Sequence, residues 1–168
     1  MDQAAVIRDA RPSDLTQITG IYGHWVRSGT SSFELEAPDL AEMTGRFEAI
    51  VSGGYPYLVL AQDERVLGYA YAGAYRPRPA YRFTAEDSIY MAPDSGGQGH
   101  GRRLLTELLA RLRAQDFRSV IGVVGDPDTN RASVALHRAA GFTEFGRARQ
   151  IGFKFDRWLD VAYLQLKL

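Results

Sequence analysis

Four glycines between a predicted strand and a predicted helix are the residues of this chain that most clearly indicate chemistry. They are Gly96, Gly97, Gly99 and Gly101, and they follow the strand-like run at residues 86–91. Glycine lets a backbone turn with positive φ and approach a ligand closely, and a helix start presents unpaired N–H groups and a positive dipole end. The junction therefore predicts a phosphate-binding loop. The glycines alone leave open a second interpretation, a flexible connection between two core elements.

The residues around the glycines disfavour the two commonest nucleotide-binding loops. A P-loop carries Lys and then Ser or Thr after its last glycine, whereas Gly101 is followed by Arg102 and Arg103. A Rossmann fingerprint follows the first strand of a βαβ unit, whereas this loop lies in mid-chain after a predicted hairpin. The loop is expected to hold the phosphates of some other ligand.

Two titratable side chains could carry acid–base chemistry beside this loop. Glu86 lies on the strand that leads into the glycines, where a partly desolvated carboxylate would have a raised pKa and accept a proton. An ordinary carboxylate facing solvent is the alternative. His137 lies on the predicted last helix, and its imidazole could act as an acid, polarise a carbonyl or simply pack in the core. No cluster of His, Asp and Glu suggests a metal, so we expect none.

Hydrophobic periodicity predicts the elements that must position these residues. The clearest helix carries Leu104, Leu105, Leu108, Leu109 and Leu112 on one face. Further elements are expected as strands at residues 6–8, 57–61, 66–75, 86–91, 120–124, 144–151 and 161–166, and as helices at 15–26, 39–51 and 130–140. The order is strand, two helices, three strands, helix, strand, helix, two strands. It predicts a single domain over residues 1–168 of the α/β class, with helices on the faces of a mixed sheet.

Composition narrows the function classes. The 168 residues are 45% hydrophobic, enough for a substantial core. Twenty basic side chains balance twenty acidic ones, so no net charge favours nucleic acid or an anionic membrane. The absence of cysteine removes disulfides, thiolate metal sites and cysteine nucleophiles. No apolar run is long enough to span a bilayer, and the N-terminus lacks the features of a secretion signal. A cytoplasmic protein is expected.

The element order and two motifs together resemble the GNAT family of acetyl-CoA-dependent N-acetyltransferases. The motifs are the turn at residues 99–101 and the later block containing Asn130, Ser133, His137 and Phe142. The blocks at residues 30–34, 81–90 and 152–161 are most similar to the phosphinothricin and methionine sulfoximine acetyltransferases within that family. One position departs from the pattern, because Gly96 stands where the family turn usually opens with Gln or Arg. The missing side chain should loosen that end of the loop.

The resemblance implies a cofactor, acetyl-CoA, and roles for particular residues. Glu86 matches the catalytic base, and His137 is the second catalytic candidate, as an acid for the departing thiolate. Asn130 resembles a cofactor-contacting asparagine, although a plain helix N-cap would also place Asn there. The strand is expected to contribute mainly main-chain groups and the glycine loop to hold the pyrophosphate. The implied cofactor-binding residues are Ile89, Tyr90, Met91, Gly97, Gln98, Gly99, His100, Gly101, Arg102 and Asn130.

The resemblance also implies a site for a small amino-acid substrate. Arg76 is the candidate for its carboxylate, because a guanidinium can hold a carboxylate with two hydrogen bonds. Members of this family commonly form dimers, so a homodimer is expected, with Lys154 approaching the partner's site. The implied substrate-binding residues are Arg76, Pro77, Arg78, Glu86, Asp87, Ser88 and Phe33.

The sequence therefore predicts an enzyme that transfers acetyl to the α-amino group of a small L-amino-acid analogue. The leading candidates are methionine sulfoximine, methionine sulfone and phosphinothricin. Direct attack is expected, since no cysteine can carry the acyl group. Two alternatives remain at this point: the same fold acting on a peptide N-terminus, a polyamine or an antibiotic, or an acyl-CoA-binding sensor without turnover.

Overall fold

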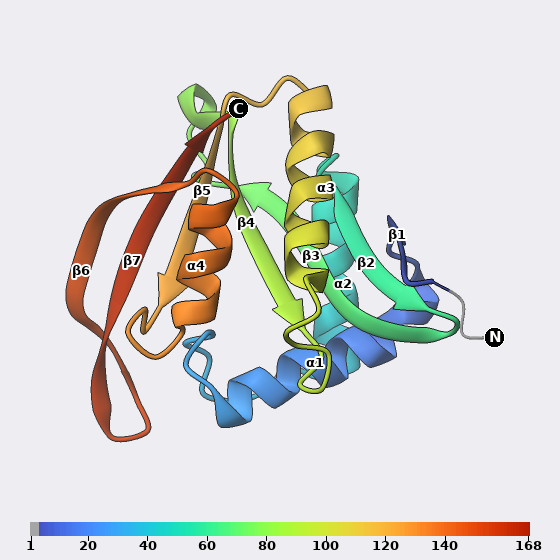
Figure 1. Ribbon diagram of the computed structural model, residues 1–168, viewed down its shortest axis with the longest axis horizontal. Helices are drawn as coiled ribbons and strands as arrows, with labels where there is room; N and C mark the ends of the chain where they lie inside the picture. Colours follow the sequence, from blue (N-terminus) through green and yellow to red (C-terminus); the bar gives the residue numbers. More distant parts are fainter. Residues whose placement is uncertain (1–3) are drawn as a thin grey trace.

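The computed structural model describes residues 4–168 and contains the helices and strands in the predicted order (Figure 1). The strands are β1 (Val6–Asp9), β2 (Tyr57–Gln62), β3 (Arg65–Ala74), β4 (Thr84–Met91), β5 (Ser119–Gly125), β6 (Thr143–Lys154) and β7 (Arg157–Lys167). The α-helices are α1 (Leu15–Ser28), α2 (Leu40–Ser52), α3 (His100–Ala114) and α4 (Arg131–Ala139). Short 3₁₀ turns at Pro12–Asp14 and Pro79–Tyr81 precede α1 and β4. Within residues 4–168, no helix has the length and apolarity needed to cross a membrane.

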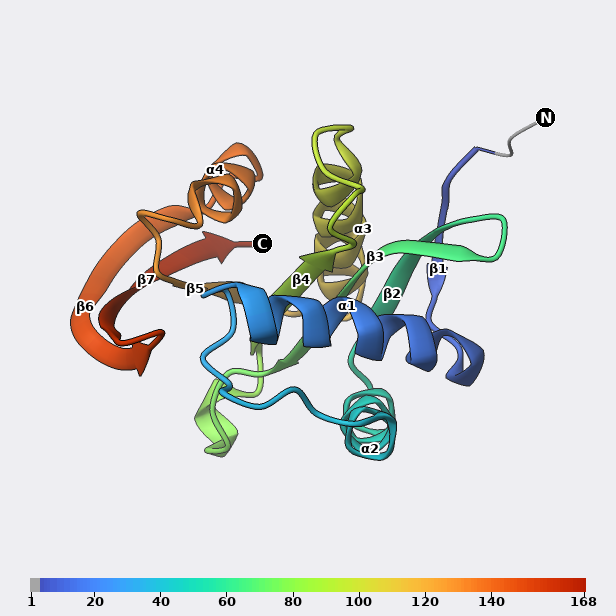
Figure 2. The same cartoon turned by 90° about the horizontal axis from the view of Figure 1, so that it is seen from below.

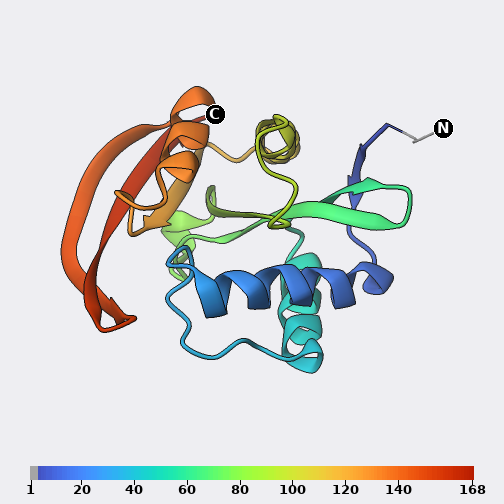
Figure 3. The same ribbon diagram turned by 60° about the horizontal axis from the view of Figure 1, so that its bottom comes forward.

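The strands form one seven-stranded mixed sheet, in the order β1-β2-β3-β4-β5-β7-β6. Neighbouring strands are antiparallel except β4 and β5, which run parallel and are connected through α3. Helices α1 and α2 cover one face of the sheet, and α3 and α4 cover the other (Figure 3). The predicted mixed α/β fold is confirmed.

Each face of the sheet has its own hydrophobic core. The five leucines predicted on one face of α3 are all buried, and the helix packs on β2, β3 and β4, which confirms that helix and its buried face. On the other face, α1 and α2 pack on a row of aromatic side chains from β2, β3 and β4. Stacking runs through that row, with Tyr57 and Tyr71 rings 4.9 Å apart and Tyr69 and Tyr90 rings 5.6 Å apart.

Strand β4 presents its side chains alternately to the two faces, as a strand must. Ile89 and Met91 pack in the core beneath α3, whereas Tyr90 packs in the core beneath α1 and α2. Glu86 therefore points to the α1/α2 face, and Asp87 points to the α3/α4 face. These two neighbouring carboxylates are separated by the sheet.

Strands β4 and β5 pair at one end only. Their ladder runs from Thr84 opposite Ser119 to Asp87 opposite Gly122 and then stops, although both strands continue. Figure 1 shows the two strands adjacent at their starts and well apart at their arrowheads. The opening lies at the carboxyl ends of the strands, where open α/β sheets bind ligands.

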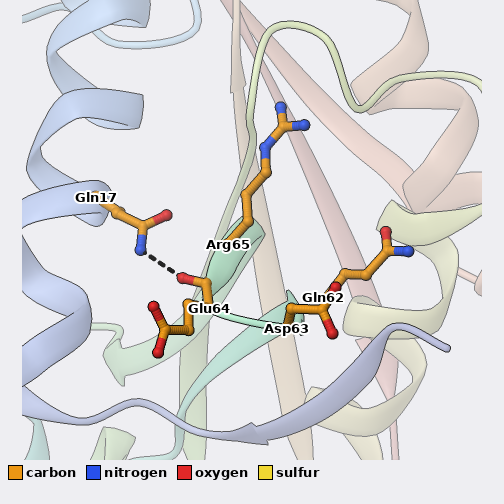
Figure 4. Close-up of a pocket in the computed structure, with 5 residues that line it drawn as sticks. All are labelled: Gln17, Gln62, Asp63, Glu64 and Arg65. Carbon is orange, nitrogen blue, oxygen red and sulfur yellow. Dashed lines mark hydrogen bonds between the residues drawn. The ribbon is translucent and has the colours of Figure 1, made fainter. Parts of the chain in front are cut away.

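Helix α1 is tied to the β2–β3 hairpin by a glutamine. Gln17 Nε2 donates to Glu64 O over 2.8 Å (Figure 4). Gln17 Oε1 accepts from Val66 N–H over 2.8 Å. A surface hollow of about 550 Å³ lies beside this clamp, lined by the hairpin turn and Gln17. It contains none of the residues predicted to do chemistry, and we assign it no role.

The β6–β7 hairpin is longer than predicted. Strands were expected near residues 144–151 and 161–166, whereas β6 extends to Lys154 and β7 begins at Arg157. Phe155 and Asp156 form the two-residue turn between them, with φ angles of 52° and 56°. Such turns usually contain Asn or Gly, so this one carries no local sequence signal. Seen from below, the hairpin curves away from the body of the sheet (Figure 2).

Candidate active site

A cavity of about 470 Å³ lies between the glycine loop, β4 and the start of α4. Gly97 and Gly99 have φ angles of +80° and +75°, values that favour glycine, and Gly99 immediately precedes α3. The Arg103 N–H bonds back to Gly99 O over 3.1 Å. An α-helix leaves the N–H groups of its first turn unpaired, so those before Arg103 are available to an anion.

All but one of the predicted cofactor residues line this cavity. Gln98 is the exception and is exposed to solvent. Arg102 lines the cavity, while the neighbouring Arg103 guanidinium donates to Ala5 O over 2.7 Å. The lining residues that were predicted are Ile89, Tyr90, Met91, Gly97, Gly99, His100, Gly101, Arg102 and Asn130.

The edge of β4 supplies main-chain groups to the cavity. Ala92 N–H donates to Leu67 O over 2.9 Å, which fixes the phase of the β3–β4 ladder. Main-chain bonds alternate in antiparallel pairs, so even-numbered residues of β4 bond to β3 and odd-numbered ones face the opening. Ile89 and Met91 thus turn their main-chain groups toward the cavity, whereas those of Tyr90 belong to the ladder. Trp25 Nε1 already donates to Met91 O over 2.8 Å.

Asp87 and His137 form a buried pair across the opening. His137 Nε2 lies 2.9 Å from Asp87 Oδ2, and the two side chains are 4% and 0% exposed. His137 Nδ1 lies 2.7 Å from Ser133 O. Gly122 makes the pair possible, because a Cβ there would stand 2.8 Å from His137 Cδ2. Asp87 therefore does not share the face of Glu86, and its contact with the amine substrate stays a prediction.

The hydrogen bonds constrain the proton on His137. A carbonyl oxygen only accepts, so Nδ1 must carry a hydrogen for Ser133. The hydrogen bond between Nε2 and Asp87 then contains one shared proton. When this proton is on Nε2, His137 is an imidazolium and Asp87 a carboxylate. Burial opposes the charge on His137, but the hydrogen bond and charge of Asp87 prevail and raise the pKa of His137. Both ring nitrogens are committed to the protein.

Glu86 lies on the opposite face, at the last stretch where β4 and β5 still pair. Burial raises the pKa of Glu86, and the adjacent charge of Asp87 raises it further. Its register partner is Gly73, and the next pair on the same face joins Ser88 to Tyr71. The carboxylate is thus half-buried beside tyrosine side chains, an environment that suits a proton acceptor.

Arg76, Pro77 and Arg78 lie in the exposed segment between β3 and β4. The Arg76 guanidinium stands over the rings of Tyr75 and Tyr81, 5.1 Å and 5.7 Å from their centres. These cation–π contacts leave the hydrogen-bonding edges of the guanidinium available.

The loop after α1 forms one wall of the opening, and Phe33 anchors it. The Phe33 ring lies between Gly125 and Gly152, so that a Cβ at Gly125 would be 2.6 Å from Phe33 Cε1. Lys154, expected at a partner's site, is instead buried in its own chain, where Nζ donates to Ser32 O over 2.8 Å. Burial lowers the pKa of Lys154, although the charge of Glu34 opposes this.

Asn130 ties the same loop to α4. Its Nδ2 donates to Thr30 Oγ1 over 3.2 Å and to Gly125 O over 2.7 Å. Asn130 occupies the N-cap position of α4, but its side chain makes no cap bond there. Asn130 lines the cavity, but its amide hydrogens are used within the protein.

The comparisons with known proteins decide the family. The profile described as "Acetyltransferase (GNAT) family" matches residues 19–142. The chain belongs to this family. It is 50% identical over 165 residues to a phosphinothricin N-acetyltransferase of Alcaligenes faecalis, covering 98% of this chain and 83% of the relative. It is 40% identical to an L-methionine sulfoximine/L-methionine sulfone acetyltransferase of Pseudomonas paraeruginosa, covering 98% and 95%. A crystal structure of a GNAT phosphinothricin acetyltransferase from Sinorhizobium meliloti in complex with AcCoA superposes with a TM-score of 0.94 at 46% identity, covering 99% and 89%.

This GNAT chain is an acetyl-transferring enzyme, and its cavity fits the acetyl-CoA that the family uses. The glycine loop offers unpaired N–H groups for phosphates, and the β4 edge at Ile89 offers main-chain groups for amides of the pantetheine arm. Within residues 4–168, no three His, Asp or Glu side chains are grouped as metal ligands would be.

The sequence did not indicate the residues of α1 and the following loop that border the opening between β4 and β5. Trp25, Thr30 and Ser31 come from α1 and the following loop. Trp25 bonds to Met91 and Thr30 to Asp126, 66 and 96 residues away in sequence. Ser31 lines the cavity. Period-two alternation could have separated Glu86 from Asp87. No sequence pattern indicated which helix would cover Asp87.

Proposed function

We propose that this enzyme transfers acetyl from acetyl-CoA to the α-amino group of a small L-amino-acid analogue. Methionine sulfoximine, methionine sulfone and phosphinothricin are the expected substrates, because relatives at 50% and 40% identity are named for them. The observation that carries the proposal is the position of Glu86. It is a half-buried carboxylate with a raised pKa on the amine side of β4, where β4 and β5 begin to part.

Glu86 acts as the base. An α-ammonium has no lone pair, so it must lose a proton before it attacks. Glu86 accepts that proton, directly or through one water, and its raised pKa makes it a stronger base than an exposed carboxylate. Bound acetyl-CoA supplies the electrophilic thioester. Main-chain N–H groups of Ile89 and Met91 face the opening and stabilise the negative charge that develops on the acyl oxygen.

The two faces of the sheet bring the two substrates together. The cofactor cavity lies on the α3/α4 side, and Glu86 points to the α1/α2 side, so the amine approaches through the gap between β4 and β5. Arg76 binds the carboxylate of the amino acid through its free guanidinium edges. His137 supports catalysis from the cofactor side, with its charge held by Asp87.

Thiol release from acetyl-CoA tests this proposal. The amines are methionine sulfoximine, methionine sulfone, phosphinothricin, common amino acids, a polyamine and a short peptide, and the cysteine-free chain adds no background. Turnover on the first three, and much less on the others, is expected. Turnover on the polyamine or peptide alone would overturn the substrate class. Acetyl-CoA binding without turnover on any amine would favour an acyl-CoA sensor.

The β6–β7 hairpin supports a homodimer. β6 is an edge strand, and five large apolar side chains on the hairpin are more than half exposed. They are Phe145, Ile151, Phe153, Phe155 and Trp158. A second copy of the chain would cover them and pair the edge.

Light scattering after size exclusion tests the homodimer. We expect the wild-type chain to be a dimer and Ile151→Asp to be a monomer. The control Val6→Asp, at the opposite edge of the sheet, should stay dimeric. A monomeric wild-type chain would contradict this part of the proposal.

The cysteine-free composition is also consistent with a cytoplasmic enzyme.

A further inference from the structure

The loop after α1 is fastened on both sides of Ser31. On one side, Thr30 Oγ1 donates to Asp126 Oδ2 over 2.7 Å. On the other, the Ser32 hydroxyl lies 2.8 Å from the Tyr22 hydroxyl, and Ser32 O accepts from Lys154. Thr30 and Ser32 are 4% and 6% exposed, and Lys154 is 4% exposed. The hydrogen-bonded anchors Thr30, Ser32 and Lys154 are thus all buried.

Ser31 is the member of this loop whose hydroxyl has no partner. Its Oγ is buried and makes no hydrogen bond within residues 4–168. A buried polar atom without a partner is costly, so native proteins rarely leave one without a reason. A loop anchored at each neighbour while this one hydroxyl stays unpaired indicates that the hydroxyl is kept for a ligand.

The position of Ser31 identifies which part of the ligand it meets. Ser31 lines the 470 Å³ cavity that reaches the glycine loop, and it also lines a narrower cavity of about 60 Å³ deeper in the opening. The deeper cavity is bounded by Asp87, Ser88 and His137, where β4 and β5 part. Phosphates held at the glycine loop place the opposite, acyl-bearing end of the cofactor toward this deeper cavity.

We propose that Ser31 Oγ donates a hydrogen bond to the thioester end of acetyl-CoA and stabilises the sulfur as it leaves. The proposal rests on acetyl-CoA as the donor, and it adds a catalytic residue from the α1–α2 loop. The amine nitrogen bonds to the acyl carbon as the carbon–sulfur bond breaks, and coenzyme A leaves as a thiolate that takes up, through solvent, the proton lost by the acylated nitrogen. No proton is transferred from the serine, because its hydroxyl is a far weaker acid than a thiol, whose ordinary pKa is about 8.5. The hydrogen bond strengthens as negative charge gathers on sulfur.

Three other polar side chains around the deeper cavity are less suited to this task. His137 has both ring nitrogens engaged, and Asn130 donates its amide hydrogens to Thr30 and Gly125. The free oxygen of Asp87 is Oδ1, which as a carboxylate only accepts hydrogen bonds.

Binding measurements without any amine test the proposal independently of the acceptor. Calorimetry on Ser31→Ala is expected to give a Kd for acetyl-CoA about three- to tenfold weaker than wild type, the range for one hydrogen bond. The Kd for adenosine 3′,5′-bisphosphate, which lacks the pantetheine arm and thioester, should be unchanged. Ser31→Thr should restore acetyl-CoA binding. The control is Ser28→Ala, because Ser28 Oγ donates to His24 O on the exposed side of α1.

Catalysis provides the second measurement. Ser31→Ala should lower kcat about tenfold at an unchanged melting temperature, because the lost hydrogen bond is stronger with the departing thiolate. An unchanged Kd and kcat in Ser31→Ala would overturn the proposal. Equal weakening of acetyl-CoA and the bisphosphate would also overturn it, since the loop would then serve the whole cavity. Failure of the wild-type protein to bind acetyl-CoA would instead overturn the proposed function.

Discussion

Replacing Gly122 with alanine should break the Asp87–His137 pair without removing either member. A Cβ on residue 122 would stand 2.8 Å from His137 Cδ2, 3.0 Å from His137 Nε2 and 3.3 Å from Asp87 Oδ1. The first two contacts are closer than van der Waals packing allows, and both involve a ring held by two hydrogen bonds. The imidazole must therefore move away from the carboxylate.

The expected loss can be estimated from the cost of overpacking. Inserting a methyl group into a packed core costs about 1–3 kcal/mol. For a chain of this size, a loss of about 2 kcal/mol lowers Tm by about 4–8 °C. Gly146→Ala is the matched strand control, because a Cβ there meets nothing within 4 Å. Its Tm should change little.

The loss of stability in Gly122→Ala should depend on pH. The pKa of His137 is raised in the folded state, so the pair stabilises the fold fully below the unfolded pKa of about 6.5. That contribution is lost as pH rises through the folded-state pKa. Gly122→Ala should therefore lower Tm more at about pH 5.5 than at about pH 9, and the His137 pKa measured by NMR should fall. An unchanged Tm and an unchanged His137 pKa would refute the account of this pair.

Three further predictions concern the loop, the amine and the base. Gly96→Arg introduces a residue type expected at this turn, at a position where a Cβ meets nothing within 4 Å. It should tighten acetyl-CoA binding about three- to tenfold by calorimetry. Gly97→Arg should weaken binding, because Gly97 has a φ of +80° that an arginine adopts only with strain. Arg76→Ala should raise the KM for the amine about tenfold and leave the Kd of acetyl-CoA unchanged, and a normal KM would remove Arg76 from the site. The rate kcat/KM should rise with pH through a midpoint above the ordinary Glu value of about 4.3, because burial and Asp87 raise the pKa of Glu86. Asp87→Asn should shift the midpoint of this rise in kcat/KM to lower pH. An unchanged midpoint would show that the charge of Asp87 does not act on Glu86.

Much of the fold could be predicted because its signals are local. The leucines of α3 recur at helical spacing, and the glycines that follow β4 mark where the chain turns into that helix. The extent of the β6–β7 hairpin could not be predicted in this way. Its turn is formed by Phe155 and Asp156 with positive φ, and only the pairing of the long flanking strands compensates for that backbone conformation.

The same distinction between local signals and long-range contacts applies to the site. The cofactor loop could be predicted from adjacent residues, and all but Gln98 of the proposed contacts line the cavity. The separation of Glu86 from Asp87 follows from strand alternation, but the partner of Asp87 depends on where α4 lies over the sheet. Ser31 could not be predicted, since only the three-dimensional structure reveals that its hydroxyl has no partner.

Glu86→Gln tests the central claim most directly, because the change removes the base and preserves the shape of the side chain. Thiol release at saturating methionine sulfoximine and the Kd of acetyl-CoA are measured on the same preparation, with Glu48→Gln on the exposed face of α2 as the control. The account predicts that Glu86→Gln lowers kcat by about 10²- to 10⁴-fold, the usual contribution of a general base, with the Kd of acetyl-CoA unchanged. A kcat within a few-fold of wild type would contradict it, because the proton would then leave the amine by a route that does not involve Glu86.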